Sequence, residues 1–147
     1  MKWIVIGLLL LGITICAGCT SSNSPSSPLV TTPVTQVEPN LVGNWMGTFT
    51  GYIDTAGYQV FQEPMTLTIV EQSDRLFKGR VTYPLNGTMV TKDVAGALSL
   101  DGRSFKTIEY PSGFSDGIII SADEIEMIYR DTTDPSKIAI DTLTRIT

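Results

Sequence analysis

The sequence predicts an all-β domain, built as an eight-stranded antiparallel up-and-down barrel. Three observations predict it: apolar and polar residues alternate from Leu41 onward, short turn motifs interrupt the alternation, and no sustained helical period is present. Eight strands joined only by hairpins favour closure, because a closed sheet has no unpaired edges. A β-sandwich is the alternative, since short strands at this spacing also fit one.

The strands and their turns can be placed along the chain. Strands are expected at 41–52, 57–71, 75–83, 88–100, 103–110, 113–121, 123–131 and 136–146. Two connections are the most typical of two-residue hairpins, Asn86-Gly87 and Asp101-Gly102, because these residue types tolerate the positive φ angles of a type I′ turn.

The alternation also assigns the faces of the strands. The face expected inside carries Met65, Leu67, Ile69, Phe77, Val81, Tyr83, Ile125, Met127 and Tyr129. The opposite face carries Thr66, Thr68, Lys78, Arg80, Glu124, Glu126 and Arg130. Glycines on the inner face are expected to permit the bending of a closing barrel: Gly43, Gly47, Gly51 and Gly79.

The chain before Leu41 has the composition of an export leader and a tether. Lys2 gives a positive start, an apolar run follows from Trp3 to Cys16, and two small residues precede Cys19, which is the order of a signal peptide. The run is short for a spanning helix, and no basic stop-transfer cluster follows it. The segment that follows is rich in Ser, Thr and Pro, as expected for an extended linker.

The motif "CAGC" at 16–19 resembles the lipobox of prokaryotic lipoproteins, with Cys16 where Leu is usual. The resemblance implies that the Cys19 thiol takes up a diacylglyceryl group and becomes the first residue after cleavage. The chain then divides into a signal peptide (1–18), a lipidated tether (19–40) and a barrel (41–147), anchored in the cell membrane on its extracytoplasmic side. An ordinary signal peptide or an uncleaved anchor is the alternative.

Composition excludes several classes of function. The chain has 10 basic and 15 acidic residues, a net charge of −5 and no basic cluster, which argues against nucleic-acid binding. It has no His, and no Cys follows Cys19, so Cys-His and Ser-His nucleophile pairs and the usual zinc sites are excluded. No catalytic residue, metal or cofactor is expected.

The turn "DTTD" at 131–134 is expected to form Asx hydrogen bonds rather than a calcium site. Asn86 also opens a glycosylation sequon.

The motif "GNWMGTF" at 43–49, with Gly-x-Trp opening the first strand, resembles the start of the calycin barrels, the lipocalins and avidins. The resemblance implies that Trp45 plugs one end of the barrel under Arg145 from the last strand. Arg145 shares its face with Asp141 rather than with Ile138 and Ile140, so a bulge would be needed to bring it inward. The wider pattern "LVGNWMGTFTGY", "DGRSF" and "DEIEMIY" also resembles uncharacterised archaeal lipoproteins.

The expected function is binding rather than catalysis, because an eight-stranded barrel is just wide enough to hold one small ligand. A small apolar molecule is the expected ligand. The candidate binding residues are Trp45, Phe49, Tyr83, Met127 and Tyr129. A structural or protein-interaction module of the cell envelope, with its interior filled by its own side chains, is the alternative. An interior cavity separates the two hypotheses.

Overall fold

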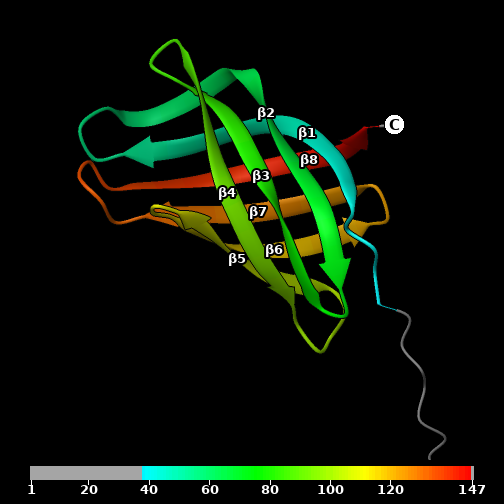
Figure 1. The fold of residues 1–147 in the computed structure, drawn as a ribbon. Helices are drawn as coiled ribbons and strands as arrows, with labels where there is room; N and C mark the ends of the chain where they lie inside the picture. The colour runs from blue at the N-terminus through cyan, green and yellow to red at the C-terminus, as the bar shows by residue number, and fades with distance from the viewer. Residues whose placement is uncertain (1–37, 147) are drawn as a thin grey trace, which may run out of the picture. The chain divides into compact units, whose positions relative to one another are not determined.

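A computed structural model describes residues 38–146, which form a closed barrel of eight antiparallel strands (Figure 1). The strands are β1 (Gly43–Ile53), β2 (Gly57–Ser73), β3 (Leu76–Leu85), β4 (Thr88–Leu98), β5 (Ser104–Tyr110), β6 (Phe114–Ser121), β7 (Glu124–Asp131) and β8 (Lys137–Ile146). The predicted strands are confirmed, and no boundary departs from its prediction by more than two residues. Cys19 and most of the expected tether lie outside the described residues.

The sheet closes where β1 pairs with β8, from Asn44 opposite Ile146 to Ile53 opposite Lys137. Every other strand pairs with its neighbours in sequence, so the up-and-down barrel is confirmed over the sandwich. The inner-face glycines allow neighbouring strands to approach closely at the bends. A Cβ atom on Gly47 would overlap the carbonyl oxygen of Thr142, and one on Gly79 would overlap that of Thr68.

Large side chains fill one half of the barrel. Phe77 on β3 lies over Gly96 on β4, and Phe105 on β5 lies over Gly117 on β6, so each ring occupies the space that a neighbouring side chain would need. The two rings meet edge to face with their centroids 5.9 Å apart. Six further fully buried side chains complete this packed half: Leu41, Trp45, Leu67, Leu98, Ile125 and Leu143.

The packed half ends at Trp45, whose ring is completely buried. Its indole Nε1 donates a hydrogen bond to the Leu41 carbonyl oxygen at 3.0 Å. The Arg145 guanidinium lies 4.1 Å from the ring centroid and donates hydrogen bonds to the carbonyl oxygens of Val42 and Asn40. One end of the barrel is therefore closed by a stacked pair that also fixes the chain entering β1.

The prediction that Arg145 needs a bulge to face inward is wrong. It assumed that the face of β8 with Ile138 and Ile140 lies inside, whereas the face shared by Asp141 and Arg145 does. Ile138 and Ile140 are about half exposed on the outer surface, whereas Asp141 and Leu143 are buried. The regular pairing of β8 with β1 and β7 runs through this region without interruption. Arg145 thus faces the interior by ordinary alternation.

One of the two predicted turns also differs. Asn86 and Gly87 both have positive φ, at 52° and 74°, which confirms the type I′ hairpin. In the β4–β5 connection only Gly102 has positive φ, and the Asp101 carboxylate instead accepts hydrogen bonds from the backbone N–H groups of Arg103 and Ser104. These side-chain bonds stabilise a longer loop than the two-residue turn expected. Within residues 38–146, no helix is long and apolar enough to cross a membrane.

Candidate ligand cavity

The end of the barrel opposite Trp45 contains a cavity of about 60 Å³. It lies between the ends of β1, β3 and β8 and reaches the surface at Tyr52 and Ile138, which are exposed. The side chains that line its interior are mainly apolar or aromatic: Phe49, Phe61, Met65, Val81, Tyr83 and Tyr129. The barrel is thus packed at one end and hollow at the other.

The aromatic wall of the cavity is built by neighbouring strands. Phe49 on β1 faces Phe61 on β2, and their rings stack with centroids 4.1 Å apart and planes 16° from parallel. Tyr83 on β3 meets Phe49 edge to face at 6.5 Å. Edge-to-face contact, as between Tyr83 and Phe49, is a favoured aromatic geometry, and the two ring contacts join β1, β2 and β3 in one wall.

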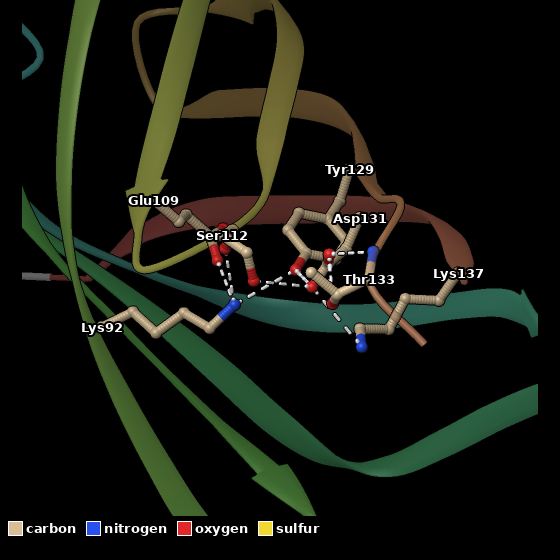
Figure 2. Close-up of polar contacts among 7 residues, drawn as sticks. All are labelled: Lys92, Glu109, Ser112, Tyr129, Asp131, Thr133 and Lys137. Atoms are coloured by element: carbon tan, nitrogen blue, oxygen red, sulfur yellow. Dashed lines mark hydrogen bonds and ion pairs between the residues drawn. The ribbon is translucent and has the colours of Figure 1, made fainter. Parts of the chain in front are cut away.

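A buried ion pair lies beside this wall. The Lys92 ammonium on β4 is 3.2 Å from Glu109 Oε2 on β5, and neither side chain is more than about a tenth exposed. Lys92 also donates hydrogen bonds to the Ser112 carbonyl oxygen at 2.8 Å and to the Tyr129 hydroxyl at 3.2 Å (Figure 2). Its ammonium lies over the rings of Tyr83 and Tyr129, at 5.8 and 5.6 Å from their centroids.

Asp131, at the end of β7, connects this ion pair to the mouth of the barrel. Its Oδ2 accepts hydrogen bonds from the hydroxyl groups of Tyr129 and Ser112, both at 3.1 Å, and lies 3.5 Å from the Lys137 ammonium (Figure 2). Its Oδ1 accepts hydrogen bonds from the backbone and the side chain of Thr133, which confirms the Asx turn. Burial opposes ionisation, but these bonds and Lys137 outweigh it and hold the pKa of Asp131 well below its usual range.

The pKa values of three further groups in the cluster, Glu109, Tyr83 and Tyr129, are raised. Burial raises the pKa of Glu109, and Lys92 offsets this only in part. Burial likewise raises the pKa values of Tyr83 and Tyr129, and the carboxylates nearby raise that of Tyr129 further. Both tyrosines are therefore neutral hydroxyl groups at physiological pH, able to donate or accept a hydrogen bond.

The Asp141 carboxyl on β8 lines the cavity. Asp141 is 4% exposed, and its strand partners on either side are Phe49 and Met127. Among the described residues, none donates a hydrogen bond to its carboxyl. Burial, and next the Glu109 charge, raise the pKa of Asp141 to about 7. This carboxyl is thus close to half ionised at neutral pH.

The structure places three of the five candidate binding residues in the cavity lining: Phe49, Tyr83 and Tyr129. Met127 is buried beside Asp141 but does not line the cavity, and Trp45 lies at the closed end. Sequence reasoning missed the charged groups of the hollow half, which are Lys92, Glu109 and Asp141. Their alternation with the buried residues Val94, Thr107 and Leu143 is the pattern that places them inside.

The geometry fits an organic ligand better than a metal ion. In the part of the chain that the structure describes, His, Cys, Asp and Glu side chains nowhere gather in a group of three or more that could hold a metal. Hard cations such as Ca²⁺ take six to eight oxygen ligands, whereas the cavity lining holds two carboxyls, Asp141 and Glu109, and Glu109 is already paired with Lys92. The arrangement offers apolar contact, neutral hydroxyl groups and one unpaired carboxyl.

Comparison with known proteins identifies the fold. No family model matches the chain, and no curated protein matches it in sequence. A redesigned β-barrel superposes with a TM-score of 0.51 at 12% identity, over 73% of this chain and 92% of the designed one. A protein of unknown function from Nostoc punctiforme gives a TM-score of 0.53 at 16% identity, over 80% of this chain and 53% of that one. The possum milk whey lipocalin trichosurin, solved with bound 4-ethylphenol, gives a TM-score of 0.44 at 14% identity, over 71% of this chain and 75% of the lipocalin. The first two likenesses, with TM-scores above 0.5, support the fold, a closed antiparallel β-barrel.

Proposed function

We propose that this protein binds a small molecule in the cavity at the open end of its barrel, and that its work is binding rather than catalysis. The observation that carries the proposal is the division of the interior. Phe77 and Phe105 pack against each other in one half, whereas the other half keeps a cavity walled by stacked aromatic rings. A concave, mainly apolar site with a few fixed polar groups is the usual form of a small-molecule site.

The cavity also limits the size of the ligand. A volume of about 60 Å³ is smaller than the roughly 150 Å³ that accommodates benzene in an apolar protein interior. The ligand enclosed at this depth is therefore a small molecule, or the small end of a longer molecule that extends past Tyr52 and Ile138 at the mouth. A whole lipid chain would not fit in the cavity.

The second candidate function is a structural or protein-interaction module of the cell envelope. The outer surface favours it, because Ile118, Ile128 and Ile140 on three successive strands are each exposed by more than two fifths. Ile128 and Ile140 are direct strand partners, but charged side chains border them, because Asp116 lies opposite Ile128 and forms ion pairs with Lys106 and Arg130. A few exposed apolar residues are normal on soluble proteins. The cavity therefore supports the binding function more directly.

The binding proposal is tested with a variant that fills the cavity. Ala139 on β8 lines it, so Ala139→Leu should occupy the space with three additional carbon atoms. Ala95→Leu on the exposed face of β4 is the matched control. We expect some members of a library of small apolar molecules to raise the melting temperature of the parent and of Ala95→Leu, but not that of Ala139→Leu. A ligand present at a hundred times its Kd stabilises by about 2.7 kcal/mol. A library without effect on the parent, or with equal effects on both variants, contradicts the proposal.

We further propose that the barrel is held at the extracytoplasmic side of the cell membrane by a lipid on Cys19. The support is the motif "CAGC" at the end of a short apolar leader. Two acyl chains hold a protein firmly, since each buried methylene contributes about 0.8 kcal/mol. Cys19→Ser should leave an uncleaved precursor, whereas Cys16→Ser should still be processed. Mature-length Cys19→Ser protein in the membrane fraction contradicts the anchor.

A further inference from the structure

The Asp141 carboxyl is buried in the barrel without a hydrogen-bond donor among the described residues. The residue is only 4% exposed, and it lines the cavity. No side chain or backbone group in residues 38–146 donates a hydrogen bond to it. An isolated buried carboxylate is costly, so such groups are paired, coordinate a metal or become protonated. A group placed in this way indicates a partner that enters the cavity.

The charges around Asp141 indicate the sign of that partner. Lys92 on β4 is paired with Glu109 on β5, and Lys137 at the start of β8 is paired with Asp131 on β7. Tyr83 on β3 and Tyr129 on β7 are neutral, and the cavity residues of β1 and β2 carry no titratable side chain apart from Tyr52 at the mouth. Because both lysine ammonium groups are already paired with other carboxylates, the Asp141 carboxyl has no cationic partner among the described residues of the hollow half. One positive charge from a ligand would supply that partner.

The walls indicate that this charge is carried by an organic group. Phe49, the β1 strand partner of Asp141, belongs to the stacked pair of rings. Tyr83 and Tyr129 add two further rings to the lining. Aromatic faces attract cations, most strongly where water is excluded. They also contact hydrocarbon, which an inorganic ion lacks. The lining therefore suits an ammonium group attached to a short apolar body.

We propose that the cavity binds a small organic cation, a primary ammonium with a compact aliphatic body, whose charge pairs with the Asp141 carboxylate. This inference rests on the proposed binding function and specifies its ligand class. The ammonium displaces the proton that Asp141 otherwise holds, and the aliphatic part contacts Phe49, Phe61 and Met65. The paired Lys92 and Glu109 remain together and form one side of the site.

Binding of this kind depends on pH in a defined direction. Only the ionised form of Asp141 pairs with an ammonium, whereas an aliphatic amine stays protonated up to a pH of about 10. Because the pKa of Asp141 is raised to about 7, affinity should rise as the pH increases. Between pH 6 and pH 8 the apparent Kd should fall roughly tenfold. A neutral ligand that accepts a hydrogen bond from protonated Asp141 would show the opposite trend.

The test compares three probes of one shape by isothermal titration calorimetry on the full chain: isobutylammonium, isobutanol and isobutyrate. At pH 8 we expect isobutylammonium to bind at least tenfold more tightly than isobutanol, and isobutyrate to bind more weakly than either. Asp141→Asn should reduce the ammonium affinity to that of the alcohol. Asp54→Asn removes the same charge from an exposed position at the same end of the barrel and should leave the tenfold preference unchanged.

Each other outcome is decisive. Equal binding of isobutylammonium and isobutanol contradicts the inference that the ligand is a cation, but it leaves the binding function supported. Tighter binding of isobutyrate has the same two consequences. Retention of the ammonium preference in Asp141→Asn, or its loss in Asp54→Asn, overturns the role of Asp141. Absence of binding by all three probes overturns the inference, and the separate comparison of Ala139→Leu with Ala95→Leu then decides the binding function. The pH series on the parent protein is independent of how the variants fold.

Discussion

Replacement of Asp141 by Asn should stabilise the protein, and more so at high pH than at low pH. The pKa of Asp141 rises from an ordinary 3.8 in the unfolded chain to about 7 in the folded one. Between these values the folded state holds a proton that the unfolded state has released, so the free energy of unfolding falls as the pH increases. Asn has no ionisation, so it removes this dependence while keeping the shape of the side chain.

The magnitude follows from the two pKa values. Each tenfold change in proton affinity corresponds to about 1.4 kcal/mol, so complete ionisation lowers the free energy of unfolding by about 4 kcal/mol. Between pH 5 and pH 8 the part lost is about 2.5 kcal/mol. For a domain of this size, that corresponds to a difference in melting temperature of roughly 10 °C.

The assay is thermal unfolding of the parent chain and of Asp141→Asn, followed by circular dichroism at pH 5 and pH 8. The quantity to compare is the variant's gain at pH 8 minus its gain at pH 5, because this difference cancels the pH-independent effect of placing an amide in the cavity. Asp54→Asn on the exposed β1–β2 turn serves as the control and should show equal effects at both values. An equal effect of Asp141→Asn at both pH values would refute the burial argument.

Three further predictions concern other parts of the barrel. Arg145→Ala should red-shift the emission of Trp45, read in a chain whose leader tryptophan is replaced by Phe, and cost about 1 to 2 kcal/mol; unchanged emission would contradict the stacking. Gly117→Ala should lower the melting temperature by more than 5 °C, because its Cβ would overlap the Phe105 ring and overpacking costs about 1 to 3 kcal/mol; a neutral effect would mean that the ring can move freely. Lys92→Met should lower the free energy of unfolding in urea by about 3 to 5 kcal/mol, because it leaves the buried Glu109 carboxylate unpaired. Adding Glu109→Leu to the same chain should restore most of the loss.

The strands could be predicted from sequence because two local rules suffice for a meander. Alternation marks each strand, and turn residues such as Asn86-Gly87 mark its end. The faces of β8 could not be read in this way. Ile138 and Ile140 are more hydrophobic than Ala139 and Asp141, yet they lie outside, because the pairing with β1 fixes the orientation of the strand.

The candidate site shows a different limit. Alternation tells which face a side chain belongs to, but it does not give its depth along the barrel axis. Trp45 and Phe49 share a face of β1, yet one lies in the packed end and the other in the cavity. Buried charges are also difficult to predict, because Lys92 or Glu109 taken alone reads as an exposed residue. Only their mutual pairing across β4 and β5 makes burial tolerable.

The packed end of the barrel affects how a ligand can come and go. Phe77, Phe105 and Trp45 are buried in the packed end, whereas the cavity lies at the other end and reaches the surface at Tyr52 and Ile138, so we expect a ligand to enter and leave there. A second molecule can enter only after the first has left by the same route. Saturation should therefore follow a simple hyperbola with one molecule per chain, and an unlabelled competitor should not accelerate the release of a bound one.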